Sequence, residues 1–70
     1  MNSIDMTFKT IGNNIKKIRK EKGLSVKELA LIANISFSYL YKIENGKCYM
    51  SLDTFLNIVE ALETNVKKLF

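Results

Sequence analysis

The feature that most constrains the fold is a three-residue gap, residues 34–36, between two stretches with helical patterns. Before the gap, Ser25 is followed three residues later by Glu28, the spacing of a capping box, which predicts that a helix begins there. Asn34 then ends the apolar pattern, and asparagine is one of the few non-glycine residues that tolerates a left-handed backbone. Ser36 is an N-cap candidate for the next helix. Two helices joined by so few residues must cross steeply.

The remainder of the chain also shows helical spacing, without the alternation of apolar and polar residues that marks a strand. A first amphipathic helix ends near Lys22, where Gly23 is a typical stop. Ser51 is the N-cap candidate of a fourth helix, and Asn65 that of a last turn. The expected inward residues are Phe8, Ile11, Ile15 and Ile18; Leu29, Ala30, Ile32 and Ala33; Leu40 and Ile43; Leu52, Phe55, Leu56, Val59 and Leu62; Val66, Leu69 and Phe70. The pattern predicts an all-α, compact five-helix bundle.

The chain of 70 residues is long enough for one small domain, and we expect a single domain over residues 1–70 with residues 1–7 as a loose N-terminal extension. One cysteine and no histidine allow no internal disulfide and argue against a structural zinc site. No apolar run is long enough to cross a membrane, and the N-terminus lacks the features of a signal peptide. We therefore expect a cytoplasmic protein that binds no membrane, cofactor, metal or small-molecule ligand. No set of catalytic side chains suggests an enzyme.

The charge is unevenly distributed. The formal net charge is +4, and residues 1–27 hold seven lysines and arginines against Asp5 and Glu21 alone. Such an excess is typical of a protein with a polyanionic partner. The alternative interpretation is a helix face that is merely well solvated.

Five short motifs occur in order and without gaps: Ile15-x-x-Ile18-Arg19, Gly23-Leu24-Ser25, Glu28-Leu29-Ala30, the run Ile43-Glu44-Asn45-Gly46-Lys47, and Ala61-Leu62. Through them the segment 11–70 resembles the lambda-repressor-like, Cro/XRE-type helix-turn-helix DNA-binding domains. The resemblance covers nearly the whole chain. It implies a lambda-repressor-like fold and double-stranded DNA as the partner. It also implies a structural salt bridge between Arg19 and Glu44.

The helix expected at about 36–45 would enter the major groove, as the resemblance implies. Helical spacing places one set of residues on its outward face, and these are the candidates for base readout: Phe37, Ser38, Tyr41 and Lys42. The family usually has a polar residue at the place of Phe37. A phenylalanine can instead contact a thymine methyl group, which favours an A·T-rich site. The two rings could alternatively contact a protein partner or a second copy of the chain.

A second set of candidates would contact DNA phosphates: Ser25, Val26, Lys27, Tyr39, Asn45, Lys47 and Lys16. For Tyr39, a position at the edge of the core is the alternative. The family usually has glycine where this chain has Asn34, and often glutamine where it has Val26.

The resulting hypothesis is a sequence-specific transcriptional regulator, a homodimeric repressor that binds an inverted-repeat operator. The alternatives are a controller- or antitoxin-type autoregulator, or a protein-binding adaptor that uses the exposed aromatic residues of the third helix. We expect the dimer contact at the fifth helix and the chain end. Met50, Leu52 and Phe55 either belong to the core or join Phe70 in that contact.

Overall fold

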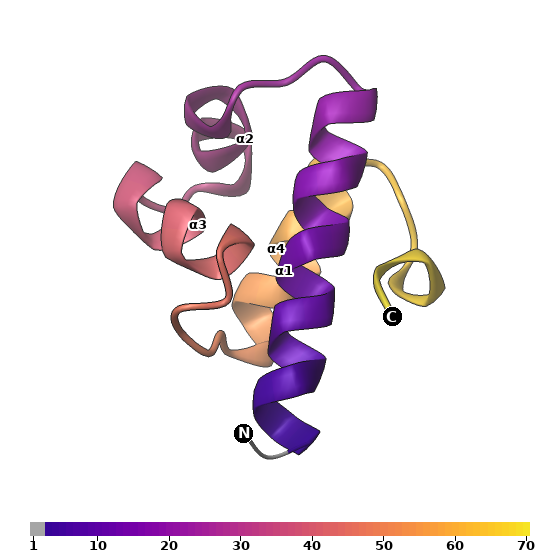
Figure 1. Ribbon diagram of the computed structural model, residues 1–70. Helices are drawn as coiled ribbons and strands as arrows, with labels where there is room; N and C mark the ends of the chain where they lie inside the picture. Colours follow the sequence, from indigo (N-terminus) through magenta and orange to yellow (C-terminus); the bar gives the residue numbers. More distant parts are fainter. Residues whose placement is uncertain (1–2) are drawn as a thin grey trace.

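Helix α1 is the longest element, and the other elements lie on both sides of it (Figure 1). The computed structural model describes residues 3–70. The elements are α1 (Ser3–Glu21), α2 (Val26–Ala33), α3 (Phe37–Glu44), α4 (Leu52–Ala61) and a 3₁₀ helix, η1 (Val66–Leu69). Within residues 3–70 no strand forms. In Figure 1, α2 and α3 lie on one side of α1 and η1 lies on the other. The all-α prediction is confirmed.

Every element contributes to one hydrophobic core. The largest fully buried side chains are Ile15, Leu29, Leu40, Ile43, Ile58, Leu62 and Leu69. Burying a side chain of this size contributes about 1.5–3 kcal/mol relative to leaving it in water. The buried stripe of each helix therefore fixes which face of that helix is left for the solvent.

Two sequence predictions about the ends of the chain are wrong. Residues 3–7 are not a loose extension but the first turns of α1, while residues 1 and 2 lie outside the described residues. The fifth helix is a single 3₁₀ turn, so the described residues form four α-helices and η1. Asn65 precedes η1, but its side chain makes no capping hydrogen bond. A four-residue segment offers too few backbone hydrogen bonds to extend into an α-helix.

Several apolar residues that we expected in the core are exposed, above all Leu52 (68%) and Phe70 (64%). Ile32, Leu56 and Val66 are exposed as well. In α4 the buried residues are instead Phe55, Ile58, Val59 and, at the C-cap, Leu62. These four follow the i, i+3, i+4, i+7 spacing of one helical stripe, and α4 packs with α2. Leu52 and Leu56 lie beside that stripe and are consequently exposed.

Gly12 allows α1 and α3 to approach each other closely. A Cβ atom added at Gly12 would collide with the backbone carbonyl group of Ile43 in α3. Because the obstacle is backbone, no side-chain movement could relieve the collision. The close contact sets the position of α3, and the sequence pattern gave Gly12 no role.

Candidate nucleic-acid interface

The turn between α2 and α3 is fixed by local hydrogen bonds. Asn34 adopts the left-handed conformation (φ 60°, ψ 43°), as its place after the apolar pattern predicted. The backbone N–H groups of Asn34 and Ile35 donate to carbonyl oxygens of the last turn of α2. The Ser36 hydroxyl oxygen then accepts from the Tyr39 N–H at 3.1 Å, so it caps α3. One helix ends and the next begins within three residues, which gives α3 a defined direction.

The predicted capping box at the start of α2 is also present. The Ser25 hydroxyl oxygen accepts from the Glu28 N–H at 3.0 Å, and the Glu28 carboxylate accepts from the Ser25 N–H at 2.9 Å. The second of these bonds is the main cause that lowers the pKa of Glu28. Because Ser25 is occupied in this way, the donors left at this helix end are the backbone N–H groups of Val26 and Lys27, which have no partner within the helix.

An ion pair holds α3 against α1. Arg19 Nε and Nη2 donate to the two carboxylate oxygens of Glu44 at 2.7 and 3.0 Å. The third nitrogen, Nη1, donates to the carbonyl oxygen of Leu24 at 2.7 Å. The pair is buried, with 8% and 2% of the two side chains exposed. The guanidinium therefore links α1, the segment before α2 and the end of α3, which is the salt bridge that the resemblance implied.

The four candidates for base readout lie together on the exposed face of α3: Phe37, Ser38, Tyr41 and Lys42. Phe37 and Tyr41 are each 52% exposed. Their rings stack with centroids 6.3 Å apart and an angle of 19° between the ring planes. Tyr39 differs from them because it is half-buried and packs against the core. The structure thus offers one continuous aromatic surface with two polar neighbours.

Four of the phosphate candidates lie near one end of α3 or the other, while Ser25 and Val26 are at the beginning of α2. Lys27 shares a surface hollow with Phe37 at the beginning of the helix. At its end, Asn45 lines another hollow with Lys16 of α1, and the Asn45 side-chain amide donates to the Tyr41 carbonyl oxygen at 2.7 Å. Lys47 follows and is exposed. The aromatic surface therefore has cationic side chains near both ends.

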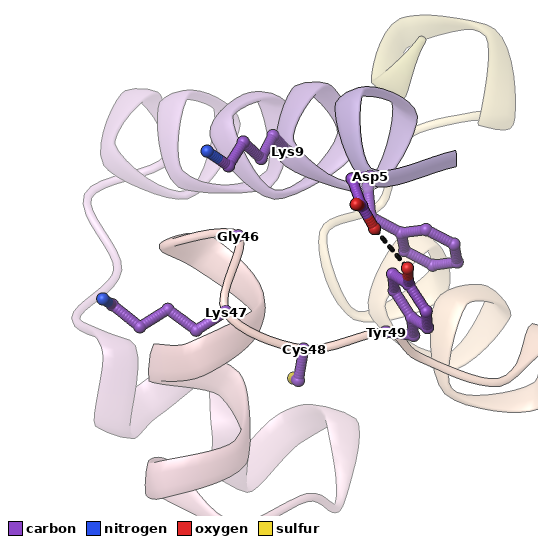
Figure 2. A pocket seen from close by; sticks show the side chains of 7 residues that line it. Asp5, Lys9, Gly46, Lys47, Cys48 and Tyr49 are labelled. Carbon is purple, nitrogen blue, oxygen red and sulfur yellow. Dashed lines mark hydrogen bonds between the residues drawn. The ribbon is translucent and has the colours of Figure 1, made fainter. Parts of the chain in front are cut away.

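The segment between α3 and α4 is attached to α1 by contacts that no sequence pattern predicted. The Tyr49 hydroxyl donates to the Asp5 carboxylate, and the rings of Tyr49 and Phe8 lie 4.8 Å apart (Figure 2). The hydrogen bond to Asp5 raises the pKa of Tyr49. Cys48 lies in the same segment, and burial raises the pKa of its thiol, so it is a weak nucleophile at neutral pH.

No group of acidic, cysteine or histidine side chains among residues 3–70 is arranged to hold a metal ion. Over the same residues, none of the helices has the length and apolar character needed to cross a membrane.

Residues 15–69 match the Helix-turn-helix family. The chain belongs to this family. This helix-turn-helix protein is 38% identical over 71 residues to the control protein C.MunI of a Mycoplasma species, a match that covers 100% of the chain and 92% of that protein. It is 44% identical over 57 residues to the immunity repressor protein of Bacillus phage phi105, which covers 81% of the chain and 40% of the repressor. Among solved structures, it is similar to the restriction-modification controller protein C.AhdI from Aeromonas hydrophila, with a TM-score of 0.86, 30% identity, and 90% and 96% of the two chains covered.

Other relatives are much longer than the matched segment. The chain spans 18% of the length of helix-turn-helix regulatory proteins from Methanothermobacter thermautotrophicus and Methanobrevibacter smithii. The helix-turn-helix domain is thus found in proteins of different lengths.

Proposed function

We propose that this helix-turn-helix protein regulates transcription by binding double-stranded DNA at a specific sequence, with α3 in the major groove. The observation that carries the proposal is the exposed face of α3, where four side chains able to contact bases lie between two cationic groups. An α-helix fits the width of the major groove. Contacts to phosphates on both sides would hold the helix in register while its outward side chains reach the bases.

The chemistry of the four side chains suggests the kind of site. Phe37 and Tyr41 would contact thymine methyl groups, which are the apolar features of the major groove. Ser38 would hydrogen-bond a base edge, and Lys42 would bind guanine or a phosphate. Apolar contacts favour a half-site rich in A·T pairs.

The phosphate contacts that we propose come from two places. At the beginning of α2 they are the backbone N–H group of Val26 and the side chain of Lys27; the Ser25 N–H, which we also expected to bind a phosphate, already donates to Glu28. At the end of α3 they are Asn45, Lys47 and Lys16, while the hydroxyl group of Tyr39 is a further candidate. Each phosphate that a cation neutralises steepens the fall of log affinity with log salt by about 0.9.

We further propose that the protein acts as a homodimer on an inverted repeat. Half-sites are read about 34 Å apart, so each α3 must lie about 17 Å from the dimer axis. A protomer with extents of 31 × 24 × 20 Å meets this requirement if the side opposite α3 forms the contact. The candidate surface for this contact is an apolar groove of about 420 Å³, lined by Phe8, Leu52, Phe55, Leu56, Val66 and Phe70 among others. Occupancy of a promoter by such a dimer would repress transcription.

Within this class, the controller type has specific support. The chain matches a control protein and the solved structure of a restriction-modification controller over more than nine-tenths of their lengths. We therefore favour a regulator of that kind, one that acts on the expression of its own gene.

The test is selection from a random duplex-DNA library, followed by fluorescence anisotropy on the selected duplex. We expect an inverted repeat with A·T-rich half-sites. Phe37→Ala should weaken binding about 5- to 150-fold, the equivalent of about 1–3 kcal/mol. Ile32→Ala is the matched control, because Ile32 is 56% exposed but lies in a hollow between α2 and α4.

The adaptor hypothesis makes the opposite prediction. If the exposed rings serve a protein partner, the library will yield no enriched sequence and Phe37→Ala will bind bulk DNA as the wild type does. Enrichment that is lost in Phe37→Ala and kept in Ile32→Ala would exclude that alternative.

A further inference from the structure

Lys9 of α1 and Lys47 of the segment after α3 extend to the same side of the molecule (Figure 2). They line one surface hollow, together with Asp5, Phe8, Gly46, Cys48 and Tyr49. The hydrogen bond between Tyr49 and Asp5 lies at the opposite end of that hollow, and the two lysine side chains point away from it (Figure 2). Two cations that are 38 positions apart in the sequence are thus brought to one place.

Gly46 makes this arrangement possible. Its φ of +66° places it in the left-handed region, and a Cβ atom there would meet the Cγ of Lys9 at 2.6 Å and its Cα at 3.4 Å. The aliphatic part of Lys9 therefore lies directly against the backbone at the end of α3. Because α1 is rigid over this turn, the position of the Lys9 ammonium group is tied to the end of the proposed DNA-reading helix.

Acidic side chains near the hollow are already engaged. The Asp5 carboxylate accepts the Tyr49 hydroxyl, and Glu44, beside Lys9 in the adjoining hollow, accepts two N–H groups of Arg19. In the part of the chain that the structure describes, Arg19–Glu44 is the only salt bridge. Lys9 and Lys47 consequently present positive charge to the solvent rather than to a carboxylate.

We propose that Lys9, together with Lys47, binds a phosphate of the DNA backbone beside the C-terminal end of α3. This inference rests on the proposed function, and it extends the DNA contact along α1 from Lys16 back to Lys9, ahead of residues 15–69. An ammonium group binds phosphate as a point charge and needs no fixed donor geometry, so two exposed lysines at one place are sufficient. The contact would add affinity for any sequence and would not discriminate between bases.

The experiment measures the affinity of the full chain for its selected duplex by fluorescence anisotropy at several salt concentrations. Lys9→Gln should weaken binding and make the slope of log affinity against log salt shallower by about 0.9 for each protomer bound. Lys9→Arg keeps the charge and should keep the slope. Lys17→Gln is the matched control: Lys17 is an exposed lysine of α1, but it follows Gly12 by five residues and so points about 140° away from α3.

A second measurement locates the contact. Replacing single phosphates of the duplex by uncharged methylphosphonates should reveal one position at which the wild type loses more affinity than Lys9→Gln does, since the variant keeps only the Lys47 contact. If Lys9→Gln and Lys17→Gln had equal salt slopes while the wild type still bound its selected duplex, the proposed Lys9 contact would be overturned and the proposed function would stand. Failure of the wild type to select any duplex would instead overturn the proposed function.

Discussion

At the scale of single residues, Arg19 shows how one side chain holds a binding surface in place. Its guanidinium contacts both carboxylate oxygens of Glu44 and the Leu24 carbonyl oxygen, so three segments meet at one group. Taking two charges out of water is costly, so such a pair fixes geometry more effectively than it adds stability. Removing one partner leaves the other charge buried without compensation.

We therefore predict that Arg19→Met lowers the free energy of unfolding by about 3–5 kcal/mol, since the Glu44 carboxylate would stay buried and unpaired. The double variant Arg19→Met/Glu44→Leu removes both charges and should recover most of this loss. Urea unfolding followed by circular dichroism measures both. A double variant as unstable as the single one would contradict the explanation.

Gly12 provides a second test at this scale. Alanine is the better helix former by about 1 kcal/mol, so Gly12→Ala should stabilise α1 if the site were open. We predict the reverse, a net loss of about 1–3 kcal/mol, because the added Cβ would collide with the Ile43 carbonyl group. The exposed neighbour Asn13→Ala is the control in the same urea measurement. A Gly12→Ala variant at or above wild-type stability would show that the helices are free to separate.

The residues whose roles could be predicted from the sequence contact groups nearby in the sequence, whereas those that could not be predicted contact residues far away in it. Ser25, Ser36 and Asn34 act on backbone groups within a few positions, and their roles could be predicted from spacing alone. Gly12 and Tyr49 act on partners 31 and 44 positions away, namely Ile43 and Asp5. Those contacts depend on how the helices pack, which local patterns do not encode. The Arg19–Glu44 pair, 25 positions apart, was accessible only through the family resemblance.

At the scale of elements, α2 is only eight residues long, so its ends matter greatly. The reciprocal bonds of Ser25 and Glu28 satisfy N–H groups that the helix itself leaves without partners. The negative charge of Glu28 also lies at the positive end of the helix dipole. At full strength, the hydrogen bond that Glu28 accepts and its interaction with the helix dipole both require the ionised carboxylate.

This requirement predicts a pH dependence of stability. Glu28 has a lowered pKa in the folded state, so its contribution is complete above the ordinary value of 4.5 and is lost as the pH falls through the folded pKa. Glu28→Gln has no such titration, and its stability should fall less steeply than that of the wild type below 4.5. Ser25→Ala keeps the backbone donor that is the larger cause of the shift, so it should retain part of the acid sensitivity. The measurement is the urea midpoint of unfolding at pH values above and below 4.5. If the midpoints of Glu28→Gln and the wild type fell by the same amount as the pH was lowered, the prediction would be contradicted.

Helix α4 marks the limit of sequence reasoning about elements. Its apolar residues fit two overlapping stripes, and periodicity alone placed Leu52 and Leu56 in the core while omitting Ile58. The packing of α4 with α2 selects the stripe that contains Ile58. Leu52 and Leu56 are left on a groove between the beginning of α1, α4 and the chain end. An amphipathic pattern therefore predicts a helix more securely than it predicts which apolar residues are covered.

At the scale of the whole molecule, the two surfaces that we propose are formed by different elements: α3 for DNA, and the beginnings of α1 and α4 with the chain end for a second copy. Exposed contiguous apolar surface on a small protein commonly marks an interface. Here the exposed residues Leu52, Leu56, Val66 and Phe70 are joined by the buried ring of Phe55, which meets Phe70 edge-on at 6.0 Å. In a symmetric dimer each of these residues would be buried twice, once in each protomer.

The double variant Leu52→Gln/Leu56→Gln tests this arrangement without changing the net charge. Burial of a leucine contributes about 1.5 kcal/mol or more, and a dimer would lose four of them, so its dissociation constant should rise about 10,000-fold or more. Sedimentation equilibrium measures the change, with Ile32→Gln as the matched exposed control on α2. The variant should keep its affinity for a single half-site, because α3 is untouched, and should lose the added affinity for the inverted repeat. Suppose instead that the wild type binds the two half-sites no more tightly together than it binds each one alone. In that case the DNA alone sets the positions of the two α3 helices, and the apolar groove has no part in recognition.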